Sequence, residues 1–274
     1  MGMAGTIAVN RRGACTLHTY LSPEDGEMVC THIIETSKHL LLVDAQLLMP
    51  YAHEVRAYAE GLGKPVERVV VTHTHPDHWM GLEAFADLPL FALPETRAEL
   101  AKIGEYLLDI KRKSHGDRTA RRLVIPDRDL AEGDIVLDGV TVRFNRLVDA
   151  EAPLMALVEL PEQRVLVAQD LVYNHVYLVV GEKNAAGEYL FDGWLRALRQ
   201  AQRNGYDLLL SGHGEPASPV LLDELIGYVT FARQRFEAGV DEQTLGREIS
   251  ARYTGYRVPE MLDLMNLFLY HRTW

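Results

Sequence analysis

The sequence has 274 residues, 47% of them hydrophobic and 24% charged, which is enough for a sizeable core in one α/β domain. With 28 basic against 39 acidic residues, the net charge of −11 argues against nucleic acid or an anionic membrane as the main partner. No apolar run approaches the roughly 18 residues that cross a bilayer, and the first residues lack a basic region followed by an apolar core. The two cysteines, Cys15 and Cys30, have no metal-ligand spacing, which favours a reduced, cytoplasmic protein.

The first seventy residues predict paired strands followed by a helix. Apolar and β-branched residues predict strands over residues 6–9, 15–20, 29–35 and 39–43. Residues 50–62 carry apolar side chains at helical spacing, and Gly63 helps to end this helix. Residues 64–71 then predict a buried strand, because three consecutive valines close it.

Residues 72–78 read Thr-His-Thr-His-Pro-Asp-His and follow that strand directly. Side chains two apart on an extended segment share a face, so His73 and His75 are predicted to project to the same side. Asp77 and His78 then lie at the turn into a predicted helix over residues 79–85. Imidazole and carboxylate are ligands that zinc accepts, and two ions about 3.5 to 4 Å apart commonly activate water. The motif therefore predicts a metal site, with a solvated histidine-rich loop as the alternative.

The next segment combines a short strand, a basic helical insertion and a hairpin. Residues 88–92 predict the strand, residues 95–122 the insertion, and residues 135–147 the hairpin. If the insertion lies over the metal pocket, its basic residues can hold an anionic substrate group such as carboxylate or sulfate. A solvated helix face is the alternative. The basic residues are Lys111, Arg112, Lys113, Arg118, Arg121 and Arg122.

Two later strands are each followed by polar residues. Residues 164–168 predict a buried strand, and Asp170 and Tyr173 come just after it. Residues 206–210 predict the last clear strand, and His213 follows between two glycines that let the backbone approach closely. A helix is predicted between these strands, over residues 192–201.

Residues 219–274 are helical by pattern, and residues 258–270 are apolar on most sides. A helix that is apolar all round must be covered. It can pack on the core, cover the pocket or form a homodimer contact, and we place core packing first. The aromatic surface that favours a contact comes from Phe268, Tyr270 and Trp274.

The metal motif and the order of the later features resemble those of the metallo-β-lactamase-fold hydrolases, over roughly residues 5 to 216. This resemblance is specific for the fold and weak for the substrate. It implies a four-layer αββα sandwich with the metal pocket at one edge. It also implies that His73 and His75 hold a first metal ion, that Asp77, His78 and His213 hold a second, and that Asp170 bridges them. Asp44, which follows the predicted strand over residues 39–43, is then either an outer partner of a ligand histidine or a turn residue.

The sequence departs from the family where a Gly-His-Ser/Thr-Pro-Gly loop commonly supplies the third ligand of the first metal. No histidine lies between His115 and His175. Matching the proline and the strand that follow places Glu151 at the histidine position, as in the alkylsulfatases that this chain resembles. Asp149 has the same parity and is the reserve candidate. An oxygen-rich site of this kind tolerates manganese or iron as well as zinc.

The resemblance implies a metal-dependent hydrolase in which a metal-bridging hydroxide attacks a small ester, thioester, lactone or related substrate. Asp77 and Tyr173 are the predicted catalytic residues, the first for proton transfer and the second as a hydrogen-bond donor to substrate. The expected cofactors are two divalent metal ions, zinc first. We expect a catalytic domain over residues 1–217 and a C-terminal helical extension over residues 218–274. The alternatives are an iron-dependent, oxygen-using enzyme similar to persulfide dioxygenases, and a non-catalytic metal-binding module.

Overall fold

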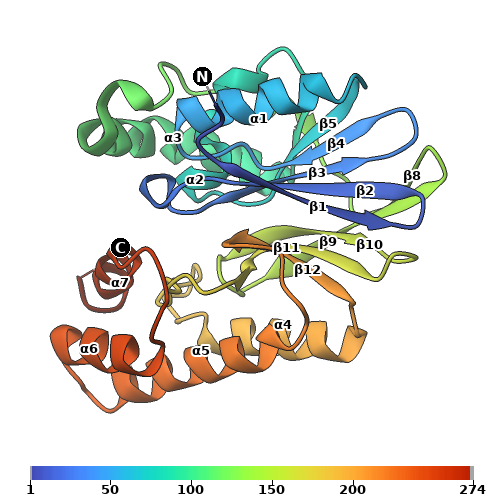
Figure 1. Ribbon diagram of the computed structural model, residues 1–274. Helices are drawn as coiled ribbons and strands as arrows, with labels where there is room; N and C mark the ends of the chain where they lie inside the picture. Colours follow the sequence, from blue (N-terminus) through green and yellow to red (C-terminus); the bar gives the residue numbers. More distant parts are fainter. Residues whose placement is uncertain (1, 272–274) are drawn as a thin grey trace.

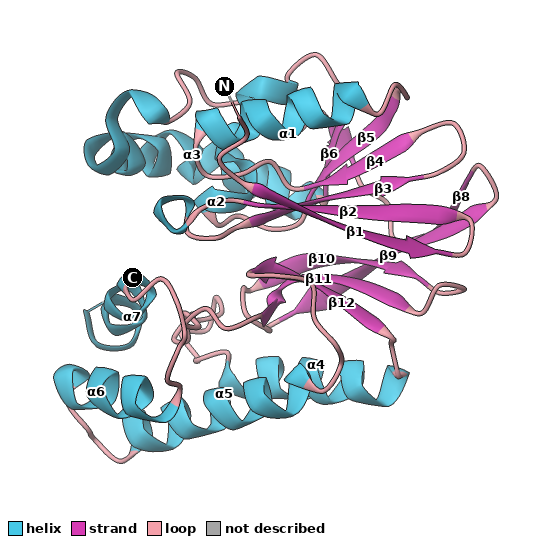
Figure 2. Cartoon of the chain, viewed as in Figure 1, coloured by secondary structure: helices cyan, strands magenta, loops and turns pink. Residues whose placement is uncertain are grey.

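The computed structural model describes residues 2–271 and places two sheets face to face between outer layers of helices (Figure 1). This arrangement confirms the predicted αββα sandwich. Helix α1 lies over the first sheet, and α4 and α5 lie over the second (Figure 2). Trp274, part of the predicted aromatic surface, lies outside the described residues.

The first sheet has seven strands that lie in sequence order. Neighbours from β1 to β4 pair antiparallel, and neighbours from β4 to β7 pair parallel. The strands are β1 (Thr6–Arg12), β2 (Cys15–Leu21), β3 (Cys30–Glu35), β4 (Leu40–Val43), β5 (Val66–Val71), β6 (Leu90–Ala92) and β7 (Arg128–Asp129). The carboxyl ends of β4 and β5 therefore meet at one edge, and the segment 72–78 begins there.

The second sheet has five strands in the order β12, β11, β10, β9, β8. Its bounds are β8 (Gly133–Leu137), β9 (Val140–Val148), β10 (Leu154–Leu160), β11 (Val165–Tyr173) and β12 (Leu208–His213). Strands β8 and β9 form the predicted hairpin, whose turn residues Asp138 and Gly139 both have positive φ (50° and 85°). Two such residues match a type I′ turn, which suits the twist of a hairpin.

The helical elements cover the outer faces and one open edge of the sandwich (Figure 1). The helices are α1 (Met49–Gly61), α2 (Pro76–Trp79), α3 (Pro94–His115), α4 (Phe191–Asn204), α5 (Leu221–Glu237), α6 (Glu242–Arg252) and α7 (Glu260–Asn266). Short 3₁₀ turns are η1 (Glu24–Gly26), η2 (Met80–Phe85) and η3 (Gly116–Arg118), and a π-helical turn, η4 (Leu267–His271), follows α7. No helix within residues 2–271 is long and apolar enough to cross a membrane.

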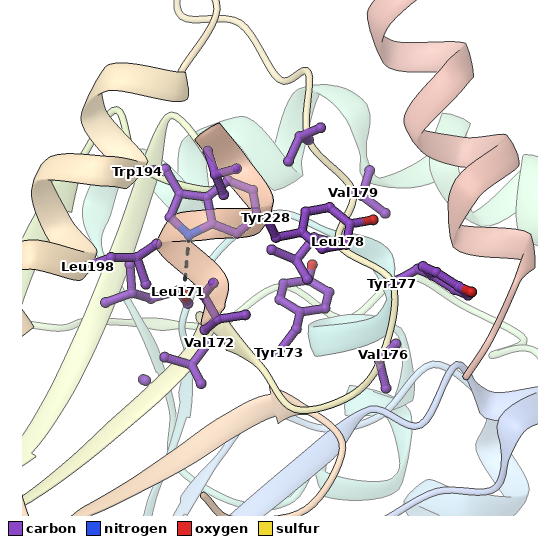
Figure 3. Close-up of a cluster of buried hydrophobic side chains, with 14 of the residues drawn as sticks. Leu171, Val172, Tyr173, Val176, Tyr177, Leu178, Val179, Trp194, Leu198 and Tyr228 are labelled. Atoms are coloured by element: carbon purple, nitrogen blue, oxygen red, sulfur yellow. Dashed lines mark hydrogen bonds between the residues drawn. The ribbon is translucent and has the colours of Figure 1, made fainter. Parts of the chain in front are cut away.

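Helices α4 to α7 share one apolar core with the second sheet. Figure 3 shows a part of it in which the indole Nε1 of Trp194 donates a hydrogen bond to the Leu171 carbonyl at 3.1 Å. Buried side chains of α5 and α6, such as Tyr228, Val229 and Ile249, belong to the same core. The C-terminal helices therefore pack on the sandwich, which was the arrangement we placed first for the tail. The boundary between a catalytic domain at residues 1–217 and a helical extension at residues 218–274 stays a prediction.

Two predicted boundaries differ from the structure in ways that matter for the site. The helix predicted over residues 79–85 begins at Pro76 as α2 and continues as the 3₁₀ turn η2. Proline suits the first turn of a helix, because that position needs no donated N–H. Strand β11 runs on to Tyr173, so Asp170 lies inside the strand and not beyond its end. The pairing with β12 shifts between Gln169 and Tyr173, and Gln169 has a φ of 43°.

Candidate metal centre

Seven side chains from four segments of the chain come together where the two sheets open at one edge. His73, His75, Glu151 and Asp170 form one group, and Asp77, His78, Asp170 and His213 form another. Within each group, one ligand atom per residue lies within 4.8 Å of all the others. Asp170 is the member common to both groups. These are the residues that the sequence predicted as metal ligands, including Glu151 in place of the usual histidine.

The distances place the two groups side by side around Asp170. Its Oδ2 lies 3.1 Å from His78 Nε2 and 3.4 Å from His213 Nε2, and also 3.7 Å from His73 Nε2. Asp77 Oδ2 lies 3.1 Å from the Nε2 atoms of both His78 and His213. Glu151 Oε1 lies 3.5 Å from His75 Nδ1. Asp170 therefore lies between the two groups.

Hydrogen bonds on the far side of each ring determine which imidazole nitrogen faces the cluster. His78 Nδ1 lies 2.8 Å from Asp44 Oδ2, and His213 Nδ1 lies 2.8 Å from the Glu27 carbonyl oxygen. Because these oxygens can only accept, each Nδ1 carries the proton, and a neutral ring then directs the lone pair of Nε2 into the cluster. This is the arrangement by which outer partners orient metal-binding histidines.

Asp44 organises the segment that carries the motif. Its Oδ1 accepts from the Thr72 backbone N–H at 2.8 Å, and its Oδ2 accepts from the Thr72 hydroxyl at 2.8 Å. The Thr72 hydroxyl has given its hydrogen to Asp44, so it accepts at 2.9 Å from Nδ1 of His73. Asp44 also accepts from the Gln169 side chain. Of the two interpretations of Asp44, the structure therefore favours the outer partner over the turn residue, although its φ of 64° also fits a turn.

His75 has a different partner, which the sequence did not indicate. Its Nε2 lies 3.3 Å from Glu182 Oε1, and its Nδ1 faces Glu151. Glu182 belongs to the segment between β11 and α4 and carries no motif of its own. Sequence analysis also missed the Glu27 carbonyl as a partner of His213, because every residue has a backbone carbonyl and the sequence does not mark this one. Only the fold brings these acceptors to the histidines.

The cluster contains buried polar atoms that have no hydrogen-bond partner within the described residues. They are His73 Nε2, His78 Nε2, Glu151 Oε2 and Asp170 Oδ1. Leaving a buried polar group unsatisfied costs about 1 to 3 kcal/mol, and two of these atoms, His73 Nε2 and Glu151 Oε2, lie only 3.9 Å apart. Imidazole nitrogens and carboxylate oxygens are the ligands that zinc binds. The residues present therefore fit a site for divalent cations.

The pKa values of His213, His75 and Asp170 reflect the opposite charges packed around them. Burial alone would lower the pKa of His213, but Asp170 and Asp77 raise it to about 10. Burial would likewise lower the pKa of His75, but Glu151 and Glu182 raise it to about 9. The carboxyl of Asp170 has its pKa held well below the usual value by His78 and His213, against the effect of burial. A bound cation would take the place of these imidazole protons, as metal binding to histidine requires.

Glu151 and Asp149 are placed differently. The Glu151 carboxyl is buried in the cluster, and burial raises its pKa to about 8 although His75 beside it opposes the shift. Asp149 belongs to no ligand group among residues 2–271. Its backbone packs on α4, where a Cβ added to Gly193 would lie 1.4 Å from the Asp149 carbonyl oxygen. Position therefore favours Glu151 as the third ligand.

Tyr173 lies at the cluster, and its hydroxyl points at carboxylates. The hydroxyl donates to Asp170 Oδ2 at 3.0 Å, and Glu151 Oε1 lies 3.4 Å away. Its ring stacks on that of His213, with centroids 4.7 Å apart and planes at 14°. Figure 3 shows the same ring among the apolar side chains of the core that α4 to α7 share with the second sheet. Tyr173 therefore supports two of the predicted ligands, and its action on substrate stays a prediction.

The basic residues of the insertion do not act together. Lys111 lines the cavity over the cluster, and its Nζ forms an ion pair with Glu27 Oε1 at 2.8 Å. Arg118 pairs with Asp25 at 2.7 Å, and Arg112 with Asp109 at 3.1 Å. These two cations face acids on the protein surface, as a solvated helix would. Among the six, only Lys111 lies at the metal cluster.

Comparisons with known proteins agree with this geometry. The family model described as the metallo-beta-lactamase superfamily matches residues 26–213. A protein of Saccharomyces cerevisiae named alkyl/aryl-sulfatase is 26% identical over 275 residues, covering 85% of this chain and 41% of that protein. The chain thus spans about two fifths of the length of this curated relative.

Solved structures show the same fold. A metallo-beta-lactamase from Pontibacter korlensis superposes with a TM-score of 0.62 at 18% identity, covering 82% of this chain and 99% of that one. The FIM-1 metallo-beta-lactamase from Pseudomonas aeruginosa, in its mono-zinc form, gives 0.59 at 18% identity, with 84% and 98% covered. The family model matches more than two thirds of the 274 residues, and the fold agrees, so the chain belongs to the metallo-beta-lactamase superfamily.

Proposed function

We propose that the protein is a metal-dependent hydrolase of a small ester, thioester, lactone or related substrate. The observation that carries the proposal is the convergence of seven ligand side chains on a buried site, with nitrogen and oxygen atoms that lack other partners. Members of this superfamily are typically hydrolases that bind divalent metals. The sulfatase-named relative adds sulfuric esters to the substrates worth testing.

His73, His75 and Glu151 would hold the first ion, and Asp77, His78 and His213 the second, with Asp170 shared. When bound, two such ions, zinc first and manganese or iron as alternatives, lower the pKa of water to near neutral and polarise the bond under attack. Glutamate in place of a third histidine adds negative charge to the first site. An oxygen-rich ligand set of this kind suits manganese or iron better than three imidazoles do.

The remaining chemistry falls to side chains that line the cavity. Asp77 Oδ2, which lies between His78 and His213, would orient the attacking water and pass its proton to the leaving group. The Tyr173 hydroxyl would stabilise negative charge on the substrate oxygen under attack, after turning from Asp170. The carboxylates of the cluster are buried, so their charges act in a poorly solvated environment.

The experiment is a hydrolysis assay on protein whose metal content is known. We expect 4-nitrophenyl acetate, a thioester, a lactone and 4-nitrophenyl sulfate to include at least one substrate of the zinc-loaded protein. A chelator should reduce turnover by at least about a thousandfold, because water without a metal ion has a pKa near 16. Re-addition of zinc should restore the rate. Chelator-resistant hydrolysis would contradict the proposal, and turnover that requires iron and oxygen would favour the oxygen-using alternative.

Glu151 and Asp149 offer a matched pair of substitutions for the third ligand. Glu151→Gln should lower the metal content and raise the Kd for zinc by about tenfold to a hundredfold, because it removes a buried anionic ligand. Asp149→Asn should leave both unchanged, because Asp149 lies outside the ligand groups and asparagine tolerates its φ of 53°. Metal analysis by mass spectrometry and a chelator competition measure the two effects. The opposite ranking would make Asp149 the ligand.

We keep the other predictions about partners and location as proposals. A small-molecule substrate, which can be anionic, fits the cavity over the cluster, and the net charge of −11 disfavours nucleic acid and membrane surfaces. Both cysteines are unpaired and buried, in keeping with a reducing cytoplasm. A homodimer through the C-terminal helices would be tested by light scattering.

A further inference from the structure

A cavity of about 420 Å³ opens onto the metal cluster, and it has mostly apolar walls and a polar floor. The floor is polar and includes His75, Asp77, Glu151, Asp170 and His213. The walls come from α3 on one side and from α7 with η4 on the other, elements that lie across the open edge from each other (Figure 1). The apolar wall residues are Tyr106, Leu107, Ile110, Val179, Met261, Leu264, Leu267 and Phe268. We call this space the tail chamber.

Several of these wall residues expose apolar surface that the fold does not use. Tyr106 is 62% exposed, Leu267 48% and Ile110 39%, although each is large and apolar. They come from two distant parts of the chain and line the same chamber. Apolar side chains gathered at the mouth of a polar site mark a ligand-binding surface more often than chance exposure.

The walls are mostly apolar although they include one lysine. Lys111 Nζ is paired with Glu27 Oε1 at 2.8 Å, and the side chains of both residues are about one fifth exposed. Glu27 therefore balances the positive charge of Lys111 at the chamber wall. The walls therefore select an uncharged, apolar group, while the floor selects a polar head.

A second cavity, of about 590 Å³, adjoins the tail chamber. The two share His75, Pro76, Tyr106, Leu107 and Phe268, so Tyr106 and Phe268 stand between them. Ile110 lines only the tail chamber, whereas Ile103, two turns earlier on the same helix, lines only the second cavity. This difference lets one helix supply both a test position and its control.

We propose that the substrate is an amphiphile, whose ester head lies at the metal cluster and whose aliphatic chain lies in the tail chamber between α3 and α7. This rests on the hydrolase function proposed above. In the reaction, water adds to the acyl carbon or sulfur and the bond to the alkoxy oxygen breaks. One proton of the water passes to the departing oxygen, so the products are an acid and an alcohol. The aliphatic chain is part of either the acid or the alcohol, and the same walls would hold it in either case.

The binding test uses unreactive neutral probes, so it does not depend on turnover or on the metal. We expect 1-octanol to bind at least about tenfold more tightly than 1-butanol by calorimetry, because each buried methylene contributes up to about fourfold. Ile110→Trp should fill the tail chamber and remove most of this difference. Ile103→Trp, an equal change on the same helix, should preserve it. Equal binding of the two alcohols, or the same loss in both variants, would overturn the proposal.

The kinetic test shows whether the aliphatic chain belongs to the acid or to the alcohol. It also distinguishes failure of the tail-chamber proposal from failure of the proposed hydrolase function. The zinc-loaded protein should prefer either 4-nitrophenyl octanoate over 4-nitrophenyl acetate, or octyl acetate over ethyl acetate, in kcat/KM. The preferred series identifies the acid or the alcohol as the chain-bearing part. Hydrolysis of short esters without a chain-length effect would overturn the tail chamber while leaving the hydrolase function. Chain-length-dependent binding without any hydrolysis would keep the chamber and reject the function.

Discussion

Asp170→Asn should reduce ester hydrolysis by the metal-loaded protein by at least about a thousandfold, which corresponds to ~4 kcal/mol or more in activation free energy. Asp170 is the member common to both ligand groups, and its Oδ2 lies within 3.7 Å of three of the histidines. An amide keeps the shape but loses the charge, so it cannot serve two cations equally. We also expect the bound metal to fall from two ions per chain to one or fewer, measured by mass spectrometry.

Asp192→Asn provides the matched control for this substitution. Asp192 lies on α4 at the surface, where its Oδ1 pairs with Arg233 at 2.6 Å. Exposed ion pairs contribute about 0 to 1 kcal/mol, so this change should leave turnover and metal content within about twofold. Circular dichroism should show that both variants are folded. Full activity in a folded Asp170→Asn protein would refute the site.

Gly212→Ala should remove both activity and stability, although no charge changes. A Cβ at position 212 would lie 1.8 Å from Asp170 Oδ1 and 2.7 Å from the Asp170 backbone nitrogen. Neither atom can yield without moving β11 or the carboxylate. We expect a loss of about 2 to 3 kcal/mol in unfolding free energy, typical of an overpacked core. A displacement of about 1 Å at Asp170 should lower kcat by about a hundredfold or more.

Gly227→Ala tests whether this effect comes from the site and not from glycine replacement in general. Gly227 lies within α5, and the nearest atom to an added Cβ is Tyr253 Oη at 3.8 Å. Alanine inside a helix should increase stability by about 0.5 to 1 kcal/mol. Denaturant unfolding and the hydrolysis assay measure both variants. If Gly212→Ala behaves like Gly227→Ala, the close approach of β12 to Asp170 is not required.

The sequence indicated candidate ligands where their identity depends on local spacing, and the structure brings these residues together. His73, His75, Asp77 and His78 lie within six residues at the end of β5, where one strand and one turn determine their directions. Glu151 was placed by matching the proline and the strand that follow the family's third-ligand histidine, and His213 by its glycine-rich loop arriving in the order that the family shows. Both assignments depend on the resemblance to the family, and the roles of the two residues as ligands stay predictions.

The sequence was less reliable where several segments contribute together. Asp170 was placed beyond a strand that in fact continues to Tyr173, because an irregular pairing with β12 has no signature in one strand alone. The basic residues of α3 and η3 look like a cluster in sequence, but Arg112 and Arg118 pair with acids away from the metal centre. Helical geometry separates side chains that are neighbours in the sequence.

By itself the sequence determined the individual strands and helices and marked the segment 72–78 as a candidate cation site, since these follow from periodicity and from the donor atoms of a few side chains. The sandwich was implied by the resemblance to the family. Only the tertiary structure decided that Glu182 and the Glu27 carbonyl orient His75 and His213, and that α3 and α7 form apolar walls over the cluster. These contacts join residues up to 186 positions apart. The packing of the whole chain determines these contacts, and no local sequence pattern encodes that packing.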